Sequence, residues 1–155
     1  MSDEQDSPGI RVPPPLFFLL PLALGLLLDR RFHIPFLPRR VARILGWPLV
    51  GGGLALSGWS VRTMLAAETT MRTDKAVSQV LQEGPFRYTR NPLYLSDAMI
   101  YAGISVIRNS LWTIVLLPLG MFVIEREVMG REESYLERTF GEEYLAYKAR
   151  VRRWI

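Results

Sequence analysis

The stretch that decides the fold is ILGWPLVGGGLALSGWSV, residues 44–61, in which no charged residue occurs. A helix needs about 20 predominantly apolar residues to cross a bilayer, and the residues from Arg62 to Ala67 can continue this one. The stretch therefore predicts a membrane-spanning helix. Small residues let helices approach closely in lipid, so we interpret its glycines as a packing face rather than a ligand site. These glycines are Gly51, Gly52, Gly53 and Gly58.

Three further apolar runs flank this one, at Leu16–Leu28, Leu93–Ile107 and Ser110–Ile124. The first run is short for a membrane crossing, so we consider a tilted crossing or one through a locally thinned bilayer. Arg108-Asn109 predicts a tight turn, so the last two runs should form an antiparallel hairpin. The expected fold is an all-α integral membrane protein with about four transmembrane helices and a C-terminal amphipathic segment at the cytoplasmic surface.

The composition excludes several kinds of site. The chain has 155 residues, 49% of them hydrophobic, a formal net charge of +4, no cysteine and one histidine. Disulfides, thiolate nucleophiles and cysteine zinc sites are excluded, and a single histidine cannot build a histidine metal cluster, so we expect no metal. We find no nucleic-acid motif, and basic residues placed between apolar runs favour anionic membrane lipids as partners.

A single domain is expected over residues 1–155. Residues 1–12 should be a mobile polar tail, since their acidic start lacks the basic region of a cleavable signal. The first two spans occupy 13–67, and 68–155 hold a polar stretch from Glu68 to Glu83, the hairpin and the C-terminal helices. The arginine-rich segment from Asp29 to Arg43 is expected to be an ordered connection at a headgroup surface.

Four spans would place both termini on one side of the membrane. Most of the 19 Lys and Arg residues lie on that side, which predicts that it is cytoplasmic, although the arginines between Arg30 and Arg43 argue against this orientation.

A loop entering a helix is predicted by QEGPFRYTRNPLYL, residues 82–95. Gly84-Pro85 indicates a turn, and Asn91-Pro92 indicates a capped helix start. Arg87 and Arg90 add cations beside that helix N-terminus, where an anion or carboxylate is favoured. The alternative is a basic loop that only flanks the membrane.

The composition changes abruptly after Ile124. The spacing of apolar residues predicts an amphipathic helix that Gly141 ends, followed by a short helix over Glu142–Arg150 with Tyr144 and Tyr147 on nearly one face. The terminal cations look like an interfacial anchor; they are Arg150, Arg152 and Arg153, next to Trp154.

Asp97 and Tyr101 lie one helical turn apart in the third apolar run. A carboxylate near the membrane is a functional candidate, and its alternative is a structural ion pair with Arg90 or Arg62.

The motif GPFRYTRNPLYL, followed by an apolar hairpin and then EESYLERTFGEEYLAYKARV, resembles the isoprenylcysteine carboxyl methyltransferase family and its phospholipid methyltransferase relatives. The resemblance covers about the second half of the chain. It implies that two segments enclose S-adenosyl-L-methionine at the cytoplasmic membrane surface. On one side it places Gly84, Arg90, Asn91, Pro92 and Tyr94.

On the other side the resemblance places Glu132 and Glu133, which we expect to face solvent and contribute little to folding. Arg150 would match an arginine near the substrate and is the catalytic candidate. The commoner family member has His at the position of Asn91, so Asn91 is assigned cofactor binding only, because an amide cannot accept a proton near neutral pH.

The resemblance implies methyl transfer to a lipophilic, amphiphilic or prenylated acceptor, first of all carboxyl O-methylation of an isoprenylcysteine-like substrate. Phospholipid or small-molecule N- or S-methylation is an alternative. A membrane reductase of the sterol reductase type, which would use NADPH, and a non-enzymatic helical scaffold are further alternatives.

Overall fold

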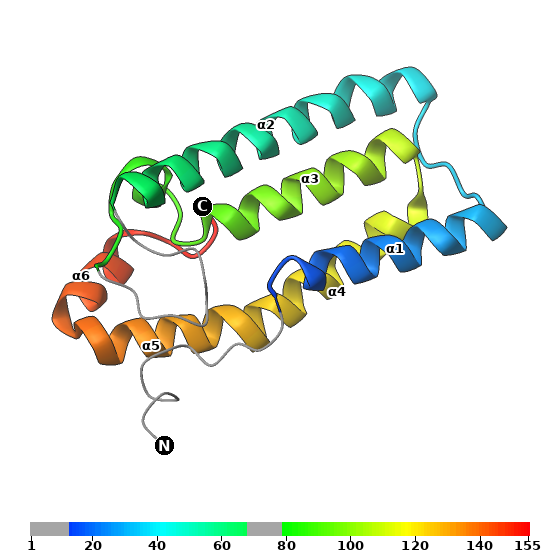
Figure 1. Cartoon of the computed structure of the whole chain (residues 1–155). Coiled ribbons are helices and arrows are strands. Elements are labelled where there is room, and N and C mark those ends of the chain that lie inside the picture. Colours follow the sequence, from blue (N-terminus) through cyan, green and yellow to red (C-terminus); the bar gives the residue numbers. More distant parts are fainter. Residues whose placement is uncertain (1–12, 68–78) are drawn as a thin grey trace.

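The computed structural model describes residues 13–67 and 79–155, and every regular element in them is helical (Figure 1). The all-α prediction is confirmed for these residues, whereas the predicted mobile tail and most of the polar stretch 68–83 lie outside them. In chain order the elements are α1 (Leu16–Arg31), α2 (Arg39–Ala66), the 3₁₀ turn η1 (Gly84–Arg87), α3 (Pro92–Arg108), α4 (Leu111–Ile124), the π-helical turn η2 (Glu125–Met129), α5 (Gly130–Phe140) and α6 (Glu142–Arg150).

The helices form two main pairs, α2 with α3 and α1 with α4 (Figure 1). Glycines bring α2 onto α3: a Cβ added at Gly46 would lie 2.9 Å from the carbonyl oxygen of Gly103, and one at Gly53 would lie 2.9 Å from that of Ser96. The packing-face prediction is therefore confirmed at Gly53, and also at Gly52, where an added Cβ would lie 3.1 Å from Cε of Met99 on α3. It is wrong at Gly51 and Gly58, around which nothing lies within 4 Å.

The second pair also depends on small residues. A Cβ on Gly25 of α1 would come within 2.8 Å of Thr113 on α4, and a Cβ on Gly120 of α4 would lie 3.0 Å from the carbonyl oxygen of Phe17. The predicted hairpin of α3 and α4 is present, since Tyr101 on α3 donates to the carbonyl of Thr113 at 2.9 Å. Each of its helices nevertheless packs mainly against a helix of the first half.

Asn109 makes the turn between α3 and α4 and ties it to the α1–α2 connection. Its φ is +53°, a left-handed conformation that asparagine tolerates better than most residues. Its side-chain oxygen accepts from the backbone N–H groups of Phe36 and Leu37 at 3.0 and 2.9 Å, and its amide donates to the Leu37 carbonyl at 2.6 Å. The connection is ordered, as predicted, but it is shorter, because α1 extends to Arg31 and α2 begins at Arg39.

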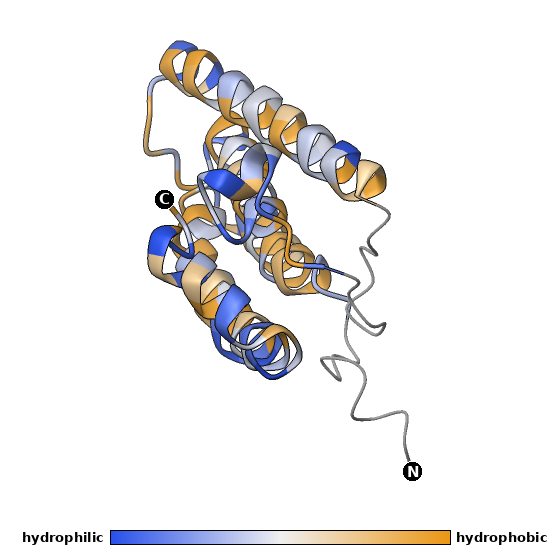
Figure 2. Ribbon diagram, turned by 90° about the vertical axis from the view of Figure 1, so that its left-hand side faces the viewer, coloured by the Kyte–Doolittle hydropathy of each residue, from blue (hydrophilic) through white to orange (hydrophobic). Residues whose placement is uncertain are grey.

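One helix of the described residues, α2, is long and apolar enough to cross a membrane. Large apolar side chains are also exposed on the α1–α4 pair, for example Leu20 and Leu27 on α1 and Val115 and Phe122 on α4. Figure 2 shows the bundle largely in hydrophobic colours, with hydrophilic residues gathered at helix ends and on the C-terminal helices. Of the four predicted crossings, α2 has the length and hydropathy of a membrane span, and the other three apolar runs form shorter helices.

Helix α5 continues α4 without a break, because the residues of η2 and the start of α5 keep right-handed helical angles. A π turn holds one extra residue and rotates the helix that follows it, and such turns are frequent at functional sites. Gly141, with φ +52°, ends α5 as predicted, and α6 then buries Tyr144 and Tyr147.

Candidate functional site

The site lies at the end of the bundle where α3 begins, next to α5 and α6 (Figure 1). The loop before α3 meets the C-terminal segment here: the backbone N–H of Arg90 donates to the carbonyl of Arg152 at 3.0 Å, and the hydroxyl of Thr89 donates to that of Arg153 at 2.9 Å. Tyr147 of α6 holds the same loop through a 2.7 Å hydrogen bond to the carbonyl of Phe86. Two sequence segments that are far apart thus form one structural unit.

Tyr94 and Glu132 form the most direct link between the two predicted halves. The buried Tyr94 hydroxyl, one turn into α3, donates to Oε1 of Glu132 on α5 at 2.8 Å. Burial raises the pKa of Glu132 to about 7, and the neighbouring charge of Glu133 adds to this, although the hydrogen bond from Tyr94 opposes it. Glu132 therefore changes charge near neutral pH.

Glu133 is the centre of an ion-pair cluster. Both of its oxygens accept from Arg153, at 2.8 Å from Nε and 2.9 Å from Nη2. Arg90 Nη1 lies 3.2 Å and Lys148 Nζ 3.6 Å from the same carboxylate. Burial acts to raise the pKa of Glu133, but the hydrogen bonds from Arg153 and these positive charges hold it below its usual value. The expectation that Glu133 faces solvent is wrong, because only 6% of the residue is exposed.

Arg90 keeps free hydrogen-bond donors inside this cluster. Its side chain is 9% exposed, and among the residues that the structure describes its Nε and Nη1 atoms have no hydrogen-bond acceptor. A buried guanidinium with unmade hydrogen bonds is costly unless another group supplies the acceptor. A ligand carboxylate has the planar geometry that fits such a pair of donors.

Asn91 and Pro92 occupy the N-cap and the first position of α3, as predicted. The Asn91 side chain makes no capping hydrogen bond, however, and its amide donates instead to the carbonyl of Arg153 at 3.2 Å. The capping interpretation of this side chain is therefore wrong. Pro92 is buried and has no N–H to leave unsatisfied at this helix end.

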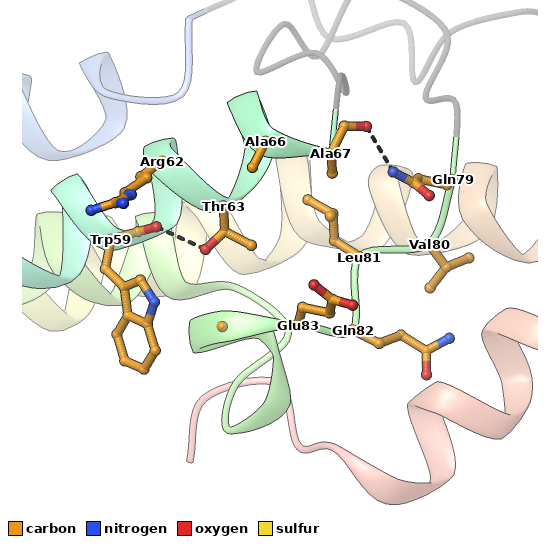
Figure 3. A pocket seen from close by; sticks show the side chains of 11 residues that line it. Trp59, Arg62, Thr63, Ala66, Ala67, Gln79, Val80, Leu81, Gln82 and Glu83 are labelled. Atoms are coloured by element: carbon orange, nitrogen blue, oxygen red, sulfur yellow. Dashed lines mark hydrogen bonds between the residues drawn. The ribbon is translucent and has the colours of Figure 1, made fainter.

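Gly84 lies apart from the carboxylates, in the wall of a pocket of about 530 Å³ at the end of α2 (Figure 3). Its φ of +55° and its contact with Thr63, whose Oγ1 would lie 2.5 Å from an added Cβ, leave room for glycine alone. The pocket has the size of a small-molecule site. It is lined by Trp59, Arg62, Thr63, Ala66, Ala67 and the segment Gln79–Gly84.

Arg150 is exposed and lies next to this pocket rather than in the carboxylate cluster. Its Nη2 donates to the side-chain oxygen of Gln82, a pocket residue, at 2.7 Å. The structure thus brings together Arg90, Asn91, Tyr94, Glu132 and Glu133. It separates Gly84 and Arg150 from them, toward the pocket.

Sequence reasoning missed the role of Arg153. We expected a membrane anchor alongside Arg152, but the Arg153 guanidinium binds Glu133 and also Glu125 at the start of η2. Trp154 likewise packs against the hydrophobic core.

Asp97 lies in α3, one turn after Tyr94, and is partly buried. Its predicted neighbour Tyr101 donates its hydroxyl to the Thr113 carbonyl at 2.9 Å, and a functional role of Asp97 stays a prediction.

Comparison with known proteins adds two findings. A family model for phospholipid methyltransferases matches residues 41–143, which include the loop before α3 and the Glu132–Glu133 pair. An uncharacterized protein of Haemophilus influenzae is 42% identical over 65 residues, which are 41% of this chain and the whole of that protein. No solved structure matches the chain.

Proposed function

Because the chain belongs to the phospholipid methyltransferase family and is therefore an S-adenosylmethionine-dependent methyltransferase, we propose that the cluster around Glu132 and Glu133 holds this cofactor and that the acceptor is an amphiphile at the membrane interface. The observation that carries the site is the meeting of the two segments through Tyr94–Glu132 at 2.8 Å and Arg90–Glu133 at 3.2 Å. Membership of this family disfavours the two alternative functions, a nicotinamide-dependent reductase and a non-enzymatic scaffold.

The residues present fit the cofactor. S-adenosylmethionine carries a carboxylate, an ammonium group and ribose hydroxyls. The N–H groups of buried Arg90 that have no acceptor suit the carboxylate. Glu132 accepts from Tyr94 through Oε1 and can also accept from the ammonium or the ribose. Pro92 and Asn91 would form the floor of this site, and Gly84 its boundary with the pocket.

When bound, the cofactor supplies an electrophilic methyl group on a sulfonium, which an acceptor attacks in line. The protein needs to align the two molecules and exclude water, effects that can supply roughly 7 to 11 kcal/mol of barrier reduction. The buried ends of Tyr94, Tyr144 and Tyr147 provide such a dry wall. Arg150, on the exposed side, would orient the polar head of the acceptor beside Gln82.

We propose carboxyl O-methylation of an isoprenylcysteine-like acceptor as the first chemistry to test, because Arg150 offers a planar guanidinium to a carboxylate. The pocket supports a second candidate. Glu83 is one of its lining residues (Figure 3), and a carboxylate there would favour an amine head and N-methylation.

Several membrane crossings with the site on the cytoplasmic side are also part of the proposal. At 1.5 Å per residue, α1, α3 and α4 are shorter than the roughly 30 Å hydrocarbon layer. The exposed apolar side chains of α1 and α4 support lipid contact, and the continuation of α4 through η2 adds length. Local thinning of the bilayer and snorkelling of the flanking side chains would accommodate α1 and α3.

Calorimetry on the full chain in detergent tests the cofactor assignment. S-adenosylmethionine and S-adenosylhomocysteine should bind and NADPH should not. Transfer of a labelled methyl group is then measured in nanodiscs with a prenylcysteine carboxylate and, separately, with phosphatidylethanolamine. Normal S-adenosylmethionine affinity in both Arg90→Ala and Glu132→Ala would refute the assigned site while leaving the enzyme class intact.

A further inference from the structure

The segment after α6, residues 151–155, crosses the loop that leads into α3. Its backbone carbonyls accept three hydrogen bonds from that loop, from the N–H of Arg90, the hydroxyl of Thr89 and the amide of Asn91. These contacts bring the Arg153 side chain over α5 and η2. The position of one side chain, Arg153, therefore depends on the same contacts that hold the proposed cofactor loop.

The Arg153 guanidinium engages both oxygens of Glu133, at 2.8 and 2.9 Å, and its Nη1 binds Glu125. A bidentate pair of this kind sets the plane and direction of a carboxylate more strictly than a single contact does. Both oxygens of Glu133 are thereby committed to Arg153.

Arg90 shows the consequence of this arrangement. It lies 3.2 Å from Glu133 Oε1, close enough for charge attraction, yet its Nε and Nη1 have no hydrogen-bond acceptor in residues 13–67 and 79–155. The oxygens of Glu133 are directed at Arg153 instead. The charge of Arg90 is thus neutralised by Glu133, and its Nε–H and Nη1–H groups are still available to a ligand.

We propose that Arg153 is a positioning residue: it holds Glu133 away from a bidentate pair with Arg90 and so reserves the Arg90 donors for the cofactor carboxylate. This inference rests on the proposed function, because it takes the Arg90 cluster as the S-adenosylmethionine site. Without Arg153, both oxygens of Glu133 are released, and the nearest buried cation that can take them bidentately is Arg90. The cofactor carboxylate then has to compete with an internal partner.

The test compares ligands with and without that carboxylate on the full chain in detergent. S-adenosylhomocysteine carries the carboxylate, and 5′-methylthioadenosine lacks the whole amino-acid part. In Arg153→Ala the Kd for S-adenosylhomocysteine should rise roughly tenfold to a hundredfold, the range for one charge-assisted hydrogen bond, while the Kd for methylthioadenosine stays within about twofold of wild type. Arg153→Lys keeps the charge but loses the bidentate geometry, so its Kd for S-adenosylhomocysteine should lie between those of wild type and Arg153→Ala.

Arg152→Ala is the matched control, because it removes an exposed charge from the same segment and keeps the carbonyl that Arg90 uses. It should bind both ligands like wild type. A double-mutant cycle adds a second reading: in a Glu133→Gln background, Arg153→Ala should cause little further loss, since the competing charge is already gone.

Equal loss of both ligands in Arg153→Ala would mean a structural role only and would overturn the proposal, as would unchanged binding of both. Failure of wild-type protein to bind S-adenosylhomocysteine would instead refute the proposed cofactor site itself. Additive effects of Arg153→Ala and Glu133→Gln would also overturn the positioning role.

Discussion

Replacing Glu133 with Gln should destabilise the folded protein more than the same change at Glu137, one turn further along α5. Glu133 is surrounded by three cations, of which Arg90 is 9% exposed, whereas Glu137 is itself 34% exposed and pairs with Lys148, which is 38% exposed. Gln keeps the size of the side chain and removes the charge. The comparison therefore measures what it costs to leave the cations unpaired.

Removing one partner of a buried ion pair costs about 3 to 5 kcal/mol. Arg153 and Lys148 keep 30% and 38% of their side chains exposed, so water compensates part of this, and we expect about 2 to 3 kcal/mol for Glu133→Gln. An exposed pair contributes about 0 to 1 kcal/mol, which is the expectation for Glu137→Gln. At about 2–4 °C per kcal/mol, the melting temperature should fall by roughly 4 to 12 °C and by at most about 4 °C, respectively.

Thermal unfolding in one detergent, followed by circular dichroism between pH 4 and pH 8, measures both effects. The folded-state pKa of Glu133 is held below its ordinary value of 4.5, so its stabilisation is present above that pH and is lost as pH falls through the folded-state pKa. The difference in melting temperature between wild type and Glu133→Gln should be constant from pH 6 to 8 and should become smaller at acid pH. Equal melting temperatures for the two variants would refute the central role of Glu133.

Three further predictions concern packing, cofactor charge and the acceptor. Gly53→Ala should lower the melting temperature, because its Cβ would lie 2.9 Å from a carbonyl oxygen of α3, whereas Gly51→Ala, with open space around it, should raise it slightly; a fall in both would contradict the packing face. S-adenosylmethionine affinity should rise as pH climbs through about 7, where Glu132 ionises, and calorimetry should find this slope gone in Glu132→Gln; a slope that persists would remove Glu132 from the site. Arg150→Lys should lose turnover in nanodiscs and keep cofactor affinity, and wild-type turnover with or without anionic lipid would refute an acceptor-orienting role.

The helices could be predicted because a long apolar run bounded by proline, glycine or charged residues can form few structures other than a helix in or near a membrane. Leu93–Ile107 and Ser110–Ile124 were predicted within a few residues of α3 and α4. Which helix packs on which could not be read from the sequence. Gly53 contacts α3 and Gly51 contacts nothing because of a rotation about the α2 axis that depends on the whole bundle.

The site divides in the same way. The family resemblance placed Tyr94 and Glu132 on two sides of one cofactor site, and the structure brings them close enough to form a hydrogen bond. Arg153 was misjudged because a cation near the end of a chain has many possible partners, and the choice of Glu133 follows from how α6 folds back after Gly141. Ion pairs between residues 20 apart have no periodic signal in the sequence.

The pairing of the helices bears on the order in which the molecule can assemble. The α2–α3 pair can form as soon as residue 108 has been made, but α1, although synthesised first, packs mainly on α4, which begins at Leu111. During synthesis α1 must therefore wait without its main partner while the second and third helices come together. A late, long-range closure of this kind is the slow step expected for a chain with such contacts, and it leaves Gly25 of α1 uncovered until α4 arrives.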